Sequence, residues 1–178
     1  MKKTMVALLA LASVCAATPA ASQRPHARGS PDSPSLLRLP RATRAGEQAL
    51  WGHIRSLTRA GGRWRLRFDP GLLLFGTAAE QAQYEDTGLH GPVANDSYEV
   101  EESHRAYTYT VSPRAVATVL ARSLAPLRVG LPELAQILRG ANPRRRPLFG
   151  DPRRASYWIT VGAAYPNPVL TIDEQYRP

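Results

Sequence analysis

The chain has 178 residues, of which 43% are hydrophobic, 21% charged and 7% aromatic, and its formal net charge is +9. This length suits one domain with appendages rather than two full domains. The single cysteine, Cys15, falls in an N-terminal segment that we expect to be removed, so a mature chain without cysteine has no disulfide, catalytic thiol, iron–sulfur cluster or thiolate zinc site.

The N-terminus has the order of a secretory signal peptide. Lys2 and Lys3 precede an apolar run over residues 5–17, and small residues follow over 18–22. The run is too short to span a bilayer, which needs roughly 20 residues. We therefore expect residues 1–22 to be a signal peptide and the protein to be periplasmic or secreted. A lipid anchor at Cys15 is disfavoured because Val14 stands where a small residue is needed.

A leader is predicted between this signal and the fold. Residues 23–46 are rich in Pro, Arg and Ser without sustained periodicity, which is typical of disordered or extended chain. We expect a single β-rich domain over residues 47–178. Beyond Lys2 and Lys3 every basic residue is an arginine, which GC-rich codon usage explains most simply. Selection for guanidinium forks that bind phosphate or carboxylate is the alternative.

The first predicted unit is a β-hairpin. Residues 63–68 alternate arginine with Trp64, Leu66 and Phe68, and Gly61-Gly62 separates this strand from an earlier one over 52–58. Asp69-Pro70-Gly71 is expected to end the second strand, with residues 72–75 folding back over the core. Thr77 and Glu80 have the spacing of a capping box, which predicts a helix over 78–86 that stops at Gly88.

Residues 98–100 and 107–111 predict one or two further strands, and others are predicted over 116–121, 157–161 and 170–172, with a second helix over 131–138. The fold class is mainly β: a small antiparallel barrel or strongly curved sheet with two short helices. A helix placed before the final strand pair favours an OB-like layout. A half-open barrel and a two-layer α+β sheet are the alternatives.

Several segments together resemble an uncharacterised family of exported bacterial proteins of the actinobacterial type. The resemblance covers residues 52–178: an Asp69-Pro70 strand end, a short Ala-rich helix, Asn95-Asp96-x-Tyr98, and the C-terminal segment Glu-Gln-Tyr-x-Pro over 174–178. It implies one intact domain and no particular activity. The chain departs from the family pattern at Ala94, in an enlarged arginine-rich segment over 143–154, and in a long loop over 162–168.

Basic residues form two candidate anion-binding groups. One is the strand face of residues 63–67, and the other is the run that follows the second predicted helix, where adjacent guanidinium groups would bind phosphate, anionic lipid or an acidic wall polymer. The alternative without a binding function is a set of solvated surface charges that pair weakly with nearby carboxylates. The candidates are Arg63, Arg65, Arg67, Arg144, Arg145, Arg146, Arg153 and Arg154.

Catalytic and metal-binding patterns are weak. Asp96 and Glu174 are the one carboxylate pair that we would test for hydrolysis, and no Gly-x-Ser-x-Gly elbow exists. Glu99 and Glu101 share a predicted strand face, but no calcium-binding loop motif surrounds them. His53 and His104 lack metal-ligand spacing. We expect no metal and no cofactor.

The favoured function is a non-catalytic, exported binding or interaction module with an arginine-rich, anion-facing surface. Its expected partner is an anionic envelope polymer, a lipid surface or an exported protein. Nucleic acid is disfavoured because aromatic residues are not interleaved with the basic run, and no membrane span is expected. The alternative function is a cell-envelope hydrolase that uses Asp96 and Glu174.

Overall fold

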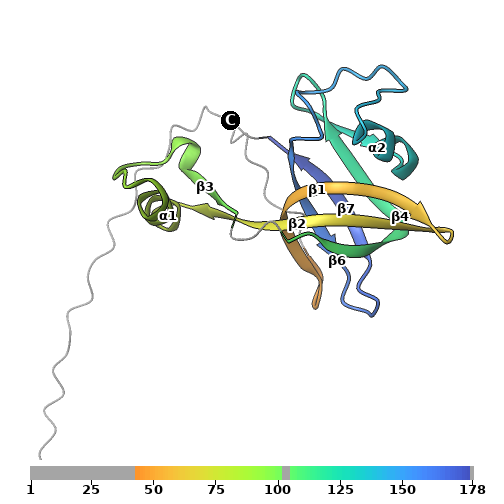
Figure 1. The fold of residues 1–178 in the computed structure, drawn as a ribbon, viewed down its shortest axis with the longest axis horizontal. Helices are drawn as coiled ribbons and strands as arrows, with labels where there is room; N and C mark the ends of the chain where they lie inside the picture. Colours follow the sequence, from red (N-terminus) through yellow and green to blue (C-terminus); the bar gives the residue numbers. More distant parts are fainter. Residues whose placement is uncertain (1–42, 102–104, 177–178) are drawn as a thin grey trace, which may run out of the picture. The chain divides into compact units, whose positions relative to one another are not determined.

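The computed structural model describes residues 43–101 and 105–176 (Figure 1). The predicted signal peptide, the leader up to residue 42 and Cys15 lie outside the described residues, as does His104. The elements discussed below all belong to one compact unit of the chain.

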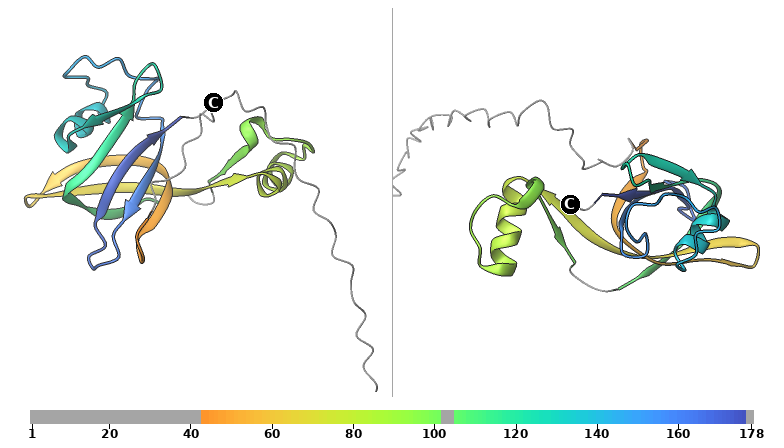
Figure 2. Two further views of the ribbon diagram at one scale, coloured as in Figure 1. Left: turned by 180° about the vertical axis from the view of Figure 1, so that it is seen from behind. Right: turned by 90° about the horizontal axis from the view of Figure 1, so that it is seen from above.

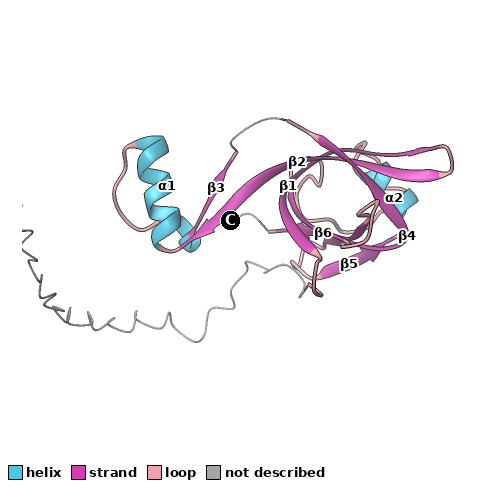
Figure 3. Ribbon diagram, turned by 90° about the horizontal axis from the view of Figure 1, so that it is seen from below, coloured by secondary structure: helices cyan, strands magenta, loops and turns pink. Residues whose placement is uncertain are grey.

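Five strands close into a mixed barrel. β1 (Gln48–Ala60) pairs with β2 (Arg63–Phe75), β2 with β4 (Tyr107–Leu120), β4 with β7 (Val169–Gln175), β7 with β6 (Ser156–Val161), and β6 returns to β1. Figure 3 shows strands of this barrel curving around a common interior. The predicted mainly β barrel is confirmed, but it is not wholly antiparallel, because β4 and β7 run parallel.

The connectivity matches the predicted OB-like layout. The short helix α2 (Leu131–Ile137) stands between the third barrel strand, β4, and the final pair, β6 and β7. It packs on β1 and β4 and buries Leu131, Leu134 and Ile137 in the barrel core. Pro132 lies in its first turn, where the missing N–H costs nothing.

The barrel interior is filled by alternate residues of each strand, as the period of two requires. In β2 the inward positions are Trp64, Leu66 and Phe68, and the last two are fully buried. The other strands contribute mainly branched aliphatic side chains to the same core: Ile54, Leu57, Val111, Val119, Ile159, Val161, Val169 and Ile172.

β2 is longer than predicted and does not end at Asp69-Pro70-Gly71. It continues to Phe75 and pairs its last four residues with β3 (Ser97–Val100). Proline is tolerated at position 70 because the pairing of β2 with β4 ends at Phe68 and its pairing with β3 starts only at Leu72. Pro70 therefore lies between two pairing partners on that edge. Residues 72–75 therefore extend away from the barrel instead of folding over it.

The far end of β2, β3 and α1 (Thr77–Thr87) form an arm beside the barrel, which Figure 2 shows from two further directions. Of the residues of α1, Ala79 alone is buried. The predicted stop at Gly88 is confirmed, since its left-handed backbone donates an N–H to Tyr84 O. The predicted capping box is wrong: Gly76 is the N-cap residue, and Thr77 is already inside the helix without a capping hydrogen bond.

Two further details correct the predictions. Residues 107–111 and 116–121 are not separate strands but one strand, β4, and the break between them is an irregularity in its pairing with β7 between Val111 and Val116. The short strand β5 (Pro126–Val129), which pairs with the end of β4, was not predicted. Asn95 and Asp96 make the expected turn, the 3-10 segment Ala94–Asp96, with positive φ values of 56° and 54°.

Candidate functional site

Three arginines project from the outer surface of the barrel along β2. Arg63, Arg65 and Arg67 are exposed, while the alternating Leu66 points into the core. Successive members of this set, which we call the arginine face, lie about 7 Å apart along the strand. The strand alternation that predicted this face is thus observed.

The neighbours of the arginine face are neutral. The register places Thr108 and Thr110 of β4 opposite Arg67 and Arg65 on one side, and Thr58 of β1 opposite Arg65 on the other. No ion pair of these three arginines is found among the described residues. Their charge is therefore not neutralised by a carboxylate within the described fold, and it faces solvent between rows of hydroxyl groups.

A pocket of about 420 Å³ opens at one end of the arginine face. It lies between the β1–β2 turn, the irregular part of β4 and the loop that joins β6 to β7. Its lining includes half-buried Trp64, the charged Arg63, and the hydroxyl-bearing residues Thr110 and Ser112. The rest of the lining is mainly proline from β4 and the β6–β7 loop: Pro113, Pro166 and Pro168.

Arginines of the second group, which we call the arginine loop (residues 143–154), are partly engaged inside the fold. Arg146 donates two hydrogen bonds to the buried carboxylate of Glu133 on α2, and Arg144 lies 3.6 Å from the same carboxylate. These contacts, the Arg146 hydrogen bond first, lower the pKa of Glu133. Arg146 therefore neutralises a buried charge and is not available as a free anion site.

Arg153 is also paired, in its case with a partly exposed carboxylate at the surface. Its guanidinium group bonds both oxygens of Asp151 at 2.7–3.0 Å, and this pairing lowers the pKa of Asp151 to about 2. Arg145 and Arg154 remain exposed. Of the predicted anion-binding residues, those of the arginine face are thus presented together, whereas the arginine loop presents fewer charges than its sequence suggests.

The structure does not bring Asp96 and Glu174 together. Asp96 is exposed in the turn before β3, beside Gly76 at the far end of β2. Glu174 is buried in β7, where it pairs with Tyr157 of β6, and β6 in turn pairs with β1. Across the sheet, Glu174 pairs with Tyr157, Tyr157 with Gly52, and Gly52 with Pro70 of β2. Pro70 is six residues from Gly76, which is roughly 20 Å along the strand. Glycosidase carboxylates lie closer than about 10 Å.

Glu174 is nevertheless chemically unusual. Burial raises its pKa to about 7, against the opposing effect of a hydrogen bond that Leu120 N–H donates to Oε2 at 2.8 Å. The carboxyl group also raises the pKa of the buried Tyr157 hydroxyl, after the larger effect of burial itself. That hydroxyl donates to Pro152 O at 2.8 Å. Glu174 lies in the barrel wall.

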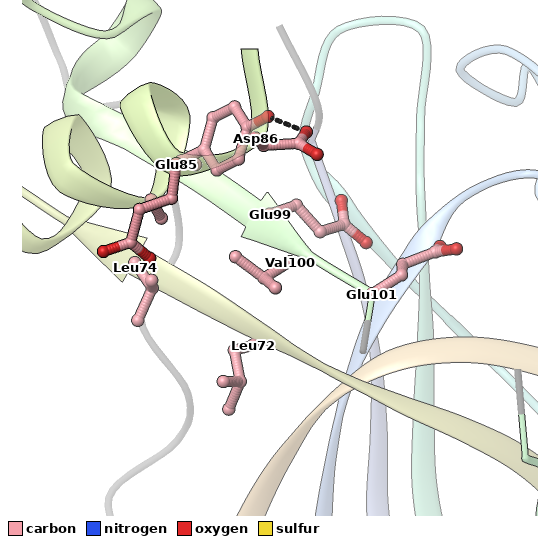
Figure 4. Close-up of a pocket in the computed structure, with 9 residues that line it drawn as sticks. Leu72, Leu74, Glu85, Asp86, Glu99, Val100 and Glu101 are labelled. Atoms are coloured by element: carbon pink, nitrogen blue, oxygen red, sulfur yellow. Dashed lines mark hydrogen bonds between the residues drawn. The ribbon is translucent and has the colours of Figure 1, made fainter. Parts of the chain in front are cut away.

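An acidic pocket lies on the arm. It has a volume of about 760 Å³, with an apolar floor that includes Leu72, Leu74 and Val100 (Figure 4). Its carboxylates come from α1, from β3 and from the residue directly after β3, and Asp86 accepts a hydrogen bond from the Tyr98 hydroxyl at 2.5 Å. The four acidic residues of the lining are Glu85, Asp86, Glu99 and Glu101.

Two of these carboxylates meet a histidine that sequence reasoning had set aside. His53 Nε2 lies 2.9 Å from Glu99 Oε1 and 2.8 Å from Glu101 Oε1. Together these three residues could hold a metal ion. The shared face of Glu99 and Glu101 was expected, but nothing in the sequence indicated that β1 would bring His53, 46 residues earlier, to the same place.

Comparison with protein-family models, with curated proteins and with solved structures finds no match to this chain. In the described part of the chain no helix has the length and apolar character needed to cross a bilayer.

Proposed function

We propose that this protein is an exported, non-catalytic binding module whose arginine face holds an anionic polymer of the cell envelope. The observation that carries the proposal is the row of three exposed arginines on β2, flanked by threonines and without an ion-pair partner in the described fold. Each guanidinium group offers a planar fork of N–H donors that matches a carboxylate or phosphate.

The pocket at the end of the row favours an acidic polysaccharide as the polymer. A half-buried tryptophan, three prolines and two hydroxyl side chains suit the face and hydroxyl groups of a sugar ring, and Arg63 suits its acidic substituent. In OB-folds the face of the second and third strands and the adjoining loops bind oligosaccharides and oligonucleotides. Those strands correspond here to β2 and β4.

The arginine loop is a weaker candidate for the same role. Glu133 and Asp151 neutralise part of its charge, so an anion that binds there would compete with existing ion pairs. A surface that is already paired gains less from a polyanion than one that is not. The proposal therefore assigns binding to β2 and treats the loop as part of the fold.

Binding to polygalacturonate, a carboxylated polysaccharide, tests the proposal. The full chain and the triple variant R63Q/R65Q/R67Q are titrated at several salt concentrations, with neutral dextran as the uncharged control polymer. The matched variant R122Q/R128Q/R139Q removes three other exposed arginines and the same charge.

We expect the β2 variant to bind at least about tenfold more weakly at low salt. The slope of the logarithm of its affinity against the logarithm of the salt concentration should become shallower by about one for each arginine removed. The matched variant should bind as the unaltered chain does. Equal weakening in both variants would mean that net charge alone governs binding. Binding of the uncharged polymer dextran would mean that the interaction does not depend on charge. Either result would overturn the proposal.

A further inference from the structure

The His53 cluster, defined as His53, Glu99 and Glu101, joins the barrel to the arm. His53 lies on β1, Glu99 on β3 and Glu101 directly after β3. Residues two apart on a strand face the same side, so both glutamates reach toward the same imidazole nitrogen. One donor atom of each residue lies within 4.8 Å of the others.

The imidazole is held as a ligand would be. Its other nitrogen, Nδ1, lies 3.2 Å from the carbonyl oxygen of Ala155, in the position to donate a hydrogen bond to it. Metal-ligating histidines almost always donate this second N–H to a carbonyl or carboxylate, which fixes the ring and its tautomer. This contact therefore directs Nε2 at the two glutamates independently of any charge on them.

A buried carboxylate oxygen without a hydrogen-bond partner among the described residues stands beside the cluster. Asp69 is the register partner of His53 on β2, so the Cβ atoms of the pair lie about 5 Å apart. Asp69 is buried, and Arg55 forms an ion pair with its Oδ2, whereas its Oδ1 has no hydrogen-bond partner among the described residues.

We propose that the His53 cluster binds one divalent transition-metal ion, with zinc as the first candidate. A nitrogen ligand together with two carboxylates suits zinc better than calcium or magnesium, which take oxygen ligands almost exclusively. Donor atoms around tetrahedral zinc stand about 3.3 Å apart, given metal–ligand distances of about 2.0–2.2 Å. The present separations of 2.8 and 2.9 Å would open by a few tenths of an ångström when the ion replaces the proton on Nε2.

A neighbouring side chain also contacts one of the two glutamates. Ser156 Oγ lies 3.4 and 3.5 Å from the two oxygens of Glu99, and Ser156 itself is buried on β6. Ala155 and Ser156 are consecutive residues, so one short segment orients both the imidazole and a carboxylate. A bound ion would thus tie β3, which otherwise pairs with β2 alone, to β1 and β6.

The test uses the untagged full chain, prepared free of metal, and titrates zinc chloride against a chromophoric chelator. Cobalt chloride supplies an independent optical readout of the ligand geometry. The variants are H53Q, E99Q and E101Q, and the matched controls are H90Q, an exposed histidine stacked on Tyr84, and E85Q, a carboxylate of the same pocket outside the cluster.

We expect one zinc ion to bind per chain with micromolar or tighter affinity. Zinc affinity should fall at least about tenfold in each cluster variant and stay unchanged in both controls. Circular dichroism without metal checks that each variant is folded, and E101Q keeps the test decisive if a more buried variant unfolds, since Glu101 is 39% exposed. No binding of zinc or cobalt by the unaltered chain, or equal binding by folded E101Q and the unaltered chain, would overturn the proposal.

Discussion

Single charged residues in this protein fall into those that the fold neutralises and those that it presents to solvent. Arg146 and Glu133 are a neutralised pair, because the carboxylate is buried on α2 and the guanidinium group bonds both of its oxygens. Arg145, the neighbouring residue, is exposed. The two arginines look equivalent in the sequence, and only the fold distinguishes them.

Replacing Arg146 should therefore destabilise the fold, whereas replacing Arg145 should not. R146Q leaves the Glu133 carboxylate without its charged donor, and we expect a loss of roughly 2 kcal/mol in the free energy of unfolding. R145Q should change it by less than about 0.5 kcal/mol. Urea denaturation at neutral pH measures both values, and equal effects would show that Glu133 does not depend on this contact.

The buried carboxyl of Glu174 makes stability depend on pH. Its pKa is raised from 4.5 in the unfolded chain to about 7 in the folded one, mainly by burial. The folded state therefore holds this proton more tightly, and its contribution is fully present below pH 4.5 and is lost as the pH rises through 7. The loss is of the order of 3 kcal/mol.

The variant E174Q isolates this effect from all other titrating groups. Glutamine keeps an oxygen that can accept the hydrogen bond from Leu120 N–H and carries no charge. Relative to the unaltered chain, E174Q should gain stability as the pH rises from below 4.5 to above 7. Denaturation curves of both proteins across this range give the difference, and a difference that does not vary with pH would contradict the raised pKa.

At the scale of elements, the path of β1 and β2 depends on one glycine. A Cβ atom at Gly52 would lie 2.0 Å from Asp69 O and 2.8 Å from Pro70 Cα, and both of these are backbone atoms that cannot simply rotate away. The two strands can approach this closely only because position 52 has no side chain. This close approach stands beside His53, so it also sets where the His53 cluster forms.

G52A should for this reason cost about 3 kcal/mol or more, since the backbone of β2 has to shift to admit the methyl group. G130A is the matched control: a Cβ there meets nothing closer than Pro132 Cδ at 3.7 Å, in ordinary contact. Thermal unfolding followed by circular dichroism compares the two. Similar midpoints for G52A and G130A would contradict the close approach of β1 and β2.

The strands of the barrel could be predicted because each buries one face, so that Leu66 and Phe68 alternate with arginines. The continuation of β2 past Pro70 could not, because proline normally ends a strand and only the gap between β4 and β3 permits it here. The arginine face followed from local alternation. The His53 cluster depends on a register between strands distant in sequence, which no local pattern encodes.

At the scale of the whole described molecule, charge is separated between barrel and arm. The barrel carries the arginine face on β2, whereas the arm carries four carboxylates around one pocket. An anionic polymer would be attracted to the first and repelled by the second over roughly the Debye length of 8–10 Å at physiological salt. Binding should therefore be confined to the barrel surface.

The most direct test of this account is a map of amide chemical shifts for the labelled full chain as polygalacturonate is added at low salt. The account predicts that the largest changes fall on β2 around Arg63, Arg65 and Arg67 and on the facing residues Thr108 and Thr110 of β4, with little change on α1 and β3. Changes concentrated in residues 143–154 or spread evenly over all exposed arginines would contradict it.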